Sequence, residues 1–513
     1  MASESAVLAP PPSSSFLTIV AALPRWPILL IAAIAARLFA FGNPLVHVDE
    51  EFYLVTAQRM LEGAIPYVDI WDRKPIGLFL LYLPAAAFGL PAAIWVYQLM
   101  ALASVVATAL ILAHLADRAG WGRGALAAAL LYLFMINFGD GQGGQAPVFY
   151  NLLMAIAVTL ILPRPEDRAG DRLRMRRALI ALGLIGVALQ IKYSVVFEGM
   201  FLGLWLLWRE RRLGVPTRRI LMFGALLVTV ALAPTVAAGL VFVAMGHGDA
   251  WLFANFTSIL ARQSDPAAEI RRSLLKIGLM LGPLLLIGGL SRHLPVAHER
   301  EREVRGLLFG WMIAATIGLL LFGGYFNHYA LPVMLPACLC CAGFLGGHRI
   351  GRRIMVPLLA CALLGGVYTT YSARYYRGNA PELETLVQAI GRGPGCLYVY
   401  SGNSSLYTHS GRCFASPWVF PSHLSRVREK GAVGVDQLAE IERIFASRPE
   451  IVVMRPPYEG ERAESRALVL RRLGEDYRLR GRYPLGNLMI DVFALQAAPT
   501  VATAPRRAAT RPS

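Results

Sequence analysis

The stretch that decides how this chain is organised runs from residue 47 to residue 77, HVDEEFYLVTAQRMLEGAIPYVDIWDRKPIG. It follows one strongly apolar run and precedes many more, yet it opens with the carboxylates Asp49, Glu50 and Glu51 and ends near Lys74. Ionised side chains are costly in hydrocarbon. The stretch therefore marks a place where the chain leaves a membrane, and its charges require a chemical explanation.

The rest of the composition is that of a polytopic membrane protein. Of the 513 residues, 56% are hydrophobic and 16% are charged, and the apolar residues come in blocks long enough to span a bilayer. A net charge of +17 would suggest nucleic-acid binding in a soluble protein, but here the arginines cluster in short loops between apolar blocks. We interpret them as topology signals and expect no nucleic-acid partner.

Eleven apolar blocks are candidate membrane spans, and the loops between them predict an orientation. The loops with most of the arginine fall on one side of this topology, which the positive-inside rule assigns to the cytoplasm together with the N-terminus. These loops are residues 164–177, 209–219, 291–305 and 348–354. The predicted spans are residues 24–42, 92–113, 124–138, 147–162, 178–191, 194–208, 220–245, 274–290, 306–323, 329–347 and 354–371.

The remaining connections are predicted to face outward. They are residues 43–91, 139–146 and 246–273, together with everything after residue 371. Within the first of them, the apolar run 76–90 is short for a span, and counting it as one would move the arginine loops to the outside. We predict a helix that lies at the outer membrane interface.

From residue 372 onward the pattern changes to that of a small α/β domain. The strand-like runs CLYVY, EIVVM and DVFAL alternate with amphipathic patterns such as VDQLAEIERIFAS. We expect a membrane domain over 1–371, an outer α/β domain over 372–497 and a disordered tail over 498–513. An oxidising location would favour a disulfide between Cys396 and Cys413.

The charges of the first outward segment divide into two groups. Asp49 and Glu50 follow the first span closely, on a segment with helical periodicity that can lie along the membrane surface. There they can meet a substrate with a polar head group and a lipid tail. The others are expected on a solvated loop surface; they are Glu51, Arg59, Glu62 and Arg73.

Three further polar residues each have two readings. Arg37 lies inside the first span, where it either snorkels to the interface or binds an anion. Lys192 ends an apolar helix and is either an interfacial anchor or an anion ligand. His328, in YFNHY, is either a helix-end histidine among interfacial aromatics or a substrate contact.

The order of these motifs resembles a known family. An apolar first helix with a late arginine is followed by DE, by Tyr53, by PYVD and by KP. This series resembles the GT-C glycosyltransferases, specifically the bacterial relatives of protein O-mannosyltransferases and lipid A aminoarabinose transferases. GDGQGGQAPVFYNLL, GVALQIKYSVVF and GGYFNHYALPVMLP resemble later family segments in the expected order, so the resemblance covers nearly the whole chain.

The resemblance implies transfer of a sugar from a polyprenyl-phosphate carrier to an acceptor. A phosphate-linked sugar already has a good leaving group, so one carboxylate base can suffice where a glycosidase typically uses two. Cations would stabilise the departing phosphate. The implied roles are Asp49 as base, Glu50 as acceptor-site or orienting carboxylate, Lys74, Lys192 and Arg37 as phosphate ligands, and Tyr53, Asp69, Asp140, Gln145 and His328 as substrate contacts.

The chain also departs from the family pattern. Many relatives carry an acidic residue in the second outward loop where this chain has Gln145, which leaves Asp140 as the nearby carboxylate. The difference puts the acceptor in doubt more than the reaction class. No cofactor is predicted; a divalent metal on His47, Asp49 and Glu50 is chemically possible, but three near-consecutive ligands are not a strong spacing.

These observations predict a glycosyltransferase of the bacterial inner membrane. It would move a monosaccharide, with inversion, from a polyprenyl-phosphate carrier to a lipopolysaccharide or other glycolipid, a polysaccharide or a protein on the periplasmic face. The alternative is a transporter or flippase of lipid-linked sugars. A transporter should carry ionisable residues near the membrane midplane and broken helices in related halves, whereas the charges here gather at one face.

Overall fold

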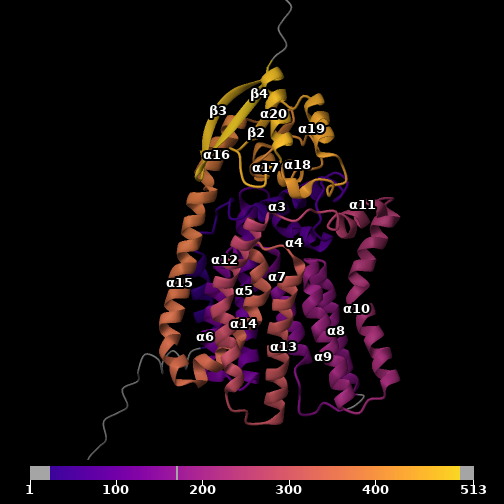
Figure 1. Cartoon of the computed structure of the whole chain (residues 1–513), viewed down its shortest axis with the longest axis vertical. Coiled ribbons are helices and arrows are strands. Elements are labelled where there is room, and N and C mark those ends of the chain that lie inside the picture. Colours follow the sequence, from indigo (N-terminus) through magenta and orange to yellow (C-terminus); the bar gives the residue numbers. More distant parts are fainter. Residues whose placement is uncertain (1–23, 169–170, 497–513) are drawn as a thin grey trace, which may run out of the picture.

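The computed structural model describes residues 24–168 and 171–496, so the predicted tail at 498–513 lies outside the described residues. The structure has two parts. A bundle of long helices carries a smaller α/β domain on one end (Figure 1).

A helix stands at each of the eleven predicted span positions. Within the described residues, seven helices are long and apolar enough to cross a membrane, so eleven crossings remain a prediction. The bundle helices are α2 (Arg25–Arg37), α5 (Ala92–Arg118), α6 (Gly122–Met135), α7 (Ala146–Ile161), α8 (Arg172–Leu189), α9 (Val196–Arg212), α10 (Thr217–Ala244), α12 (Ala267–Leu290), α13 (Glu299–Phe322), α14 (Leu331–Gly347) and α15 (Arg349–Arg377).

The bundle has a packed centre and an apolar exterior. Large apolar side chains on α10 and α15, such as Leu221, Val243 and Leu364, are exposed, as expected of helices whose outer face meets hydrocarbon. In the centre, α14 is buried and lies so close to α6 that a Cβ at Gly124 would lie 1.9 Å from the Ala342 carbonyl oxygen. Small residues permit this close approach between membrane helices.

The arginine-rich loops come together at the end of the bundle that lies away from the α/β domain (Figure 1). Asp167 of the first loop forms ion pairs with Arg177 and with Arg209, whose Nη2 lies 2.9 Å from Asp167 Oδ2. Arg209 Nε lies 2.7 Å from Glu303 Oε1 of a third loop. The arginine loops and the α/β domain therefore lie at opposite ends of the bundle, which agrees with the predicted topology.

The first outward segment forms two helices, α3 (Val48–Leu61) and α4 (Ile76–Ala86), as its patterns predicted. The position of α3 along the membrane surface stays a prediction, but α3 is covered by protein. Its residues from Glu50 to Ala57 are buried, because α3 packs against α4 and against α17 (Ser405–Ser410) of the α/β domain (Figure 1). The segment is therefore enclosed between the bundle and the domain.

The α/β domain is built on a four-stranded sheet with the order β1-β2-β4-β3. β1 (Leu397–Val399) and β2 (Ile451–Met454) are parallel, and β4 (Leu488–Leu495) runs antiparallel to β2 and to β3 (Tyr477–Leu485). The runs CLYVY, EIVVM and DVFAL are confirmed as strands. The remaining helices are α16 (Ala380–Ile390), α18 (Ser422–Ser425), α19 (Gln437–Ala446) and α20 (Ala463–Asp476).

Two junctions tie the domain to the rest of the chain. Helix α15 continues past residue 371, the boundary expected from the sequence, and ends at Arg377. The backbone N–H of Trp71, in the first outward segment, donates to the Pro417 carbonyl at 3.0 Å. Within the domain, Cys396 and Cys413 form the predicted disulfide.

Candidate functional site

A cavity of about 1070 Å³ lies where the bundle meets the α/β domain. The start of α3, the loop before α4 and the connections after α8 and α10 line one side, and loops of the domain line the other. Cations outnumber carboxylates on its wall, which suits an anionic ligand. The cations are Arg73, Lys74, Lys192, Arg262, Lys276, Arg377, Arg426, Arg428 and Arg455, and the carboxylates are Asp49, Asp72, Asp140, Glu429 and Glu459.

Part of the same wall is apolar. Leu189 and Ile191 at the end of α8, Val196 of α9, Leu232 of α10 and Ile259 contribute it. Leu189, Val196 and Leu232 lie on helices whose outer faces carry exposed apolar side chains. The cavity thus joins a charged region beside α3 to an apolar region between bundle helices, the combination that an amphipathic, lipid-linked anion requires.

The start of α3 positions Asp49. His47 is the N-cap residue, and its Nδ1 accepts a hydrogen bond from the Asp49 backbone N–H at 3.2 Å. The Asp49 carboxylate, 13% exposed, lies 3.5 Å from Lys74 Nζ and 3.5 Å from His47 Nδ1. Burial raises the pKa of Asp49, but the charge of Lys74 outweighs it and holds the pKa well below its ordinary value. Asp49 is therefore an ionised carboxylate on the cavity wall.

Lys74 stands between two carboxylates. Its Nζ lies 3.1 Å from Asp72 Oδ2 and 3.5 Å from Asp49 Oδ1, and 5.0 Å from the centre of the Phe420 ring. Burial lowers the pKa of Lys74, whereas Asp72 and Asp49 raise it, with a net increase. The ammonium is therefore charged in the absence of any ligand, and an anion must compete with Asp49 and Asp72 for it.

Lys192 has a different environment. It lies between α8 and the short η2 helix (Tyr193–Val195), with Nζ 4.0 Å from the centre of the Tyr329 ring. Among the described residues no carboxylate forms an ion pair with it, and burial lowers its pKa to about 7. A half-buried cation without a counter-ion is unfavourable, so this position on the cavity wall favours an anionic ligand.

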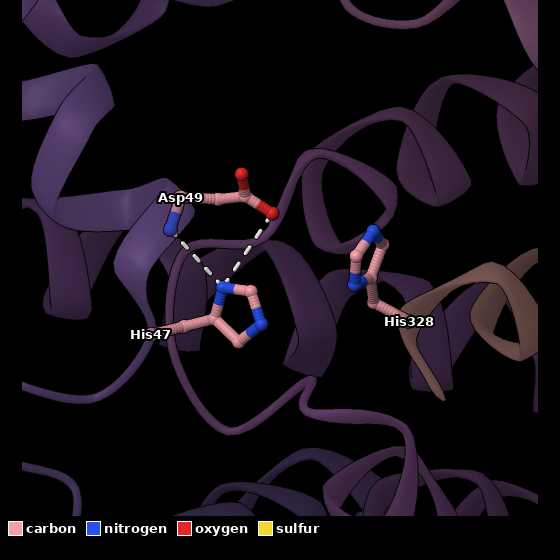
Figure 2. A group of neighbouring side chains, drawn as sticks. All are labelled: His47, Asp49 and His328. Carbon is pink, nitrogen blue, oxygen red and sulfur yellow. Dashed lines mark hydrogen bonds and ion pairs between the residues drawn. The ribbon is translucent and has the colours of Figure 1, made fainter. Parts of the chain in front are cut away.

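His47, Asp49 and His328 form a cluster with a metal-binding donor set. Their ligand atoms all lie within 4.8 Å of one another, and His328 approaches the pair from a separate segment (Figure 2). The His328 ring packs edge to face against His47, with ring centres 5.5 Å apart. Two imidazoles and one carboxylate suit Zn²⁺ or a similar divalent ion; His328 stands where the sequence suggested Glu50.

Four residues expected at the substrate do not line this cavity. Arg37 is fully buried, and its guanidinium donates to the carbonyls of Gly141 and Gln142, so it holds the second outward loop. Glu50 is also buried, and burial raises its pKa to about 8. The other two contact neighbouring protein groups. Gln145 Nε2 lies 2.6 Å from His47 Nδ1, and the Asp69 carboxylate accepts a hydrogen bond from the Ile65 backbone N–H.

The other expected residues, Asp49, Tyr53, Lys74, Asp140, Lys192 and His328, do line the cavity. Asp140 forms an ion pair with Arg377 at 2.7 Å, so its carboxylate is already engaged. Tyr53 extends the wall beside Lys74, whose Nζ lies 5.4 Å from the centre of its ring. The structure thus groups most of the residues selected from the motifs, although they come from four separate segments.

Two of the charges expected in a solvated loop are covered by the α/β domain, Glu51 fully and Arg73 in part, so that expectation is wrong for them. Glu51 is 5% exposed and accepts a hydrogen bond from Asn403 of the α/β domain at 3.3 Å. Arg73 forms an ion pair with Glu429 of the same domain at 2.7 Å. The domain covers this side of the first outward segment, whereas Arg59 and Glu62 pair with each other at the surface.

Several cavity residues were not predicted from the sequence. They are Arg262 and Lys276, near the α10–α12 connection, and Arg426, Arg428, Arg455 and Tyr458 of the α/β domain. The signal that could have pointed to the last two is RPPYEGER, at residues 455–462, directly after a predicted strand. Loops that follow parallel strands commonly carry binding residues in α/β folds.

No protein-family model matches the chain, and no curated protein matches it in sequence. Its structure is similar to that of ArnT from Cupriavidus metallidurans bound to undecaprenyl phosphate, with a TM-score of 0.61 and 13% identity over 91% of this chain and 98% of that one. It is also similar to the Archaeoglobus fulgidus oligosaccharyltransferase in complex with Zn and sulfate, with a TM-score of 0.50 and 13% identity over 84% of this chain and 67% of that one.

A further similar structure is AglB from Archaeoglobus fulgidus in complex with an inhibitory peptide and a dolichol-phosphate. Here the TM-score is 0.50, with 12% identity over 86% of this chain and 70% of that one. ArnT and AglB are both GT-C enzymes. The chain therefore has the GT-C fold that its motifs resembled.

Proposed function

We propose, from this GT-C fold and its cavity, that the chain is a membrane glycosyltransferase. It would transfer a monosaccharide from a polyprenyl-phosphate carrier to an acceptor of the cell envelope, a lipopolysaccharide or other glycolipid, a polysaccharide or a protein. The observation that carries the proposal is the ionised Asp49 beside Lys74, at the junction of a cationic and an apolar wall. The solved neighbours that hold undecaprenyl phosphate or dolichol-phosphate support the same donor class.

The proposed reaction is a single displacement at the anomeric carbon. An acceptor hydroxyl gives its proton to the Asp49 carboxylate while its oxygen forms the new bond to the sugar. The bond from the sugar to the phosphate oxygen breaks, and the polyprenyl phosphate leaves with the electron pair. Attack opposite the leaving group inverts the anomeric centre, and one carboxylate suffices because phosphate leaves without protonation.

Lys74 and Lys192 would bind the donor phosphate and stabilise its growing charge. Because the Lys74 ammonium lies between Asp49 and Asp72, a phosphate that draws it away from Asp49 would raise the basicity of that carboxylate. Donor binding would thereby activate the base. The apolar wall at Leu189 and Leu232 would receive the first part of the polyprenyl chain.

A divalent ion on His47, Asp49 and His328 would supply Lewis-acid stabilisation of the phosphate oxygens when bound. Two imidazoles and a carboxylate whose ligand atoms all lie within 4.8 Å of one another fit such an ion. Gln145, which contacts His47 Nδ1 at 2.6 Å, would orient that imidazole whether or not a metal is present.

The test of the proposed function is transfer in detergent. Purified protein in micelles has no two compartments, so a transporter or flippase of lipid-linked sugars would leave the donor intact. We expect release of undecaprenyl phosphate from an undecaprenyl-phosphate sugar that depends on an added envelope acceptor fraction, measured by thin-layer chromatography. Undiminished donor with every acceptor fraction, in protein that still binds the donor, would favour the transporter.

The side on which transfer occurs is also a proposal. We expect the α/β domain and the cavity on the periplasmic side of the bacterial inner membrane, because the arginine loops lie at the opposite end. Single cysteines replacing the exposed Arg478 in β3 and the exposed Arg218 in the first turn of α10 should then show opposite labelling by a membrane-impermeant maleimide in intact cells. Labelling of both from one side would contradict the topology.

The pKa of Lys192 predicts a pH dependence of donor binding. Burial lowers this pKa to about 7, so the free protein loses the ammonium as the pH rises through neutrality. Binding of undecaprenyl phosphate, which stabilises the charged form, should weaken by up to roughly tenfold per pH unit above that pKa. Lys192→Arg, which stays protonated, should bind with little change between pH 7 and pH 8.5; parallel profiles for both proteins would contradict the assignment.

A further inference from the structure

The α/β domain presents the ends of its two parallel strands to the cavity. Ser401 and Gly402 lie shortly after β1 and Arg455 follows β2 directly, and all three line the wall. The Arg455 backbone N–H donates to the Ser401 carbonyl at 3.1 Å, which locks the two strand ends together. Ligands of open α/β sheets bind outside the carboxyl ends of parallel strands, so this edge is a natural place for one.

Two guanidinium groups share one aromatic ring at this edge. Arg455 Cζ lies 4.5 Å from the centre of the Tyr458 ring, and Arg426 Cζ lies 5.9 Å from it. The Tyr458 hydroxyl is fixed by a hydrogen bond with Ser425 Oγ at 2.5 Å. Stacking of this kind orients guanidinium groups while leaving their N–H donors free to bind oxyanions.

These two arginines differ from the others on the wall. Arg428 lies 3.0 Å from Asp265, and Arg73 and Arg262 both pair with Glu429, so each of these three has a carboxylate partner. Arg455 has no carboxylate partner among the described residues, and its Nε is buried without a hydrogen-bond acceptor.

Arg426 is only partly neutralised, and the backbone makes room for it. Its Nη2 lies 3.4 Å from Glu269 Oε1, but its Nε is buried without a hydrogen-bond partner. Gly460 has a φ of +79°, and a Cβ there would lie 2.6 Å from Arg426 Nη2. The absence of a side chain at Gly460 therefore leaves the space that the Arg426 guanidinium occupies beside Tyr458.

We propose that Arg455, with Arg426, binds an oxyanion of the acceptor, a phosphate or a carboxylate group. This inference rests on the proposed function, because only a transferase has an acceptor. Lys74 and Lys192, the proposed ligands of the donor phosphate, lie on the bundle side of the cavity, whereas Arg455 lies on the domain side. A second group of cations on the opposite wall fits a second anion, and an acceptor that carries one would be held across Asp49.

The test uses full-length protein in detergent and radiolabelled inorganic phosphate as the probe. Binding is measured with and without saturating undecaprenyl phosphate, which fills the proposed donor site. We expect phosphate binding that persists in the presence of undecaprenyl phosphate and weakens about tenfold in Arg455→Gln. Arg426→Gln should weaken it as well, and Arg478→Gln, on an exposed strand away from the cavity, should not.

Phosphate binding that Arg455→Gln leaves unchanged, or that undecaprenyl phosphate abolishes, would overturn the inference. Thermal melting of each variant separates loss of binding from loss of folding, and Arg426→Gln provides a second variant of the site. Acetate as a competitor distinguishes a phosphate site from one that also accepts a carboxylate. Displacement of the labelled phosphate by an equal concentration of acetate would show that the site also accepts a carboxylate. No displacement would assign the site to phosphate. If undecaprenyl phosphate itself does not bind, the proposed function fails, while dependence on Arg455 still decides this inference.

Discussion

Replacing Asp49 by asparagine should reduce the rate of sugar transfer by about a hundredfold or more, because it removes the proposed base while keeping the shape of the side chain. The fold should survive, since Asp49 lies on a cavity wall and not in the packed core. The amide also leaves Lys74 with Asp72 as a counter-ion at 3.1 Å. Donor binding should therefore change much less than turnover.

The measurement is single-turnover transfer from a purified undecaprenyl-phosphate sugar by detergent-solubilised variants at matched amounts. Glu62→Gln is the matched control, because Glu62 follows the same helix and pairs only with Arg59 at the surface. Glu50→Gln should also be mild, since Glu50 is buried behind the wall. Near-normal turnover by Asp49→Asn would exclude it as the base, and a large loss in Glu50→Gln alone would move the base by one residue.

Replacing Lys74 by glutamine should lower kcat/KM for the donor by roughly a hundredfold, about 3 kcal/mol of transition-state stabilisation. The substitution removes a phosphate ligand and also leaves Asp49 and Asp72 without the cation between them. Unlike Asp49→Asn, it should weaken binding of undecaprenyl phosphate itself. Comparison of the two variants thus separates the base from the phosphate ligand.

The control is Lys430→Gln, which removes an exposed lysine from the α/β domain and should leave the kinetics unchanged. Because two carboxylates lose their counter-ion in Lys74→Gln, its melting temperature must be measured as well. A folded Lys74→Gln protein with unchanged donor affinity and kcat/KM would remove Lys74 from the site. Loss of donor binding without loss of folding would support its role.

Most of the helical architecture followed from the sequence because membrane helices obey a strong constraint. Every backbone polar group must be satisfied within the helix, and the apolar blocks had to be long. β3 was not predicted: its arginines alternate with Tyr477, Leu479 and Tyr483, but the strand is mostly exposed and contains Gly481 and Pro484, which weaken the strand signal. A strand of this kind is specified by its partner β4, which local pattern does not reveal.

The site was predictable only in part, for a similar reason. Asp49 and Lys74 belong to one short segment, and an ionised pair at a membrane exit is visible in the sequence. Arg455 and Arg428 come to the cavity through packing of the α/β domain onto the bundle, which no local pattern encodes. The same packing buried Glu51 and half-buried Arg73, two residues that a local reading assigns to water.

The contacts of Glu51 and Arg73 with Asn403 and Glu429 also bear on how such enzymes diversify. Helix α3, which carries Asp49, packs against the α/β domain, the part of the chain that we expect to select the acceptor. A chimaera that exchanged only residues 378–496 for the matching part of a relative would leave Glu51 without Asn403 and Arg73 without Glu429. New acceptor specificity is therefore more accessible by substitution within the loop at residues 455–462 than by exchange of the whole module.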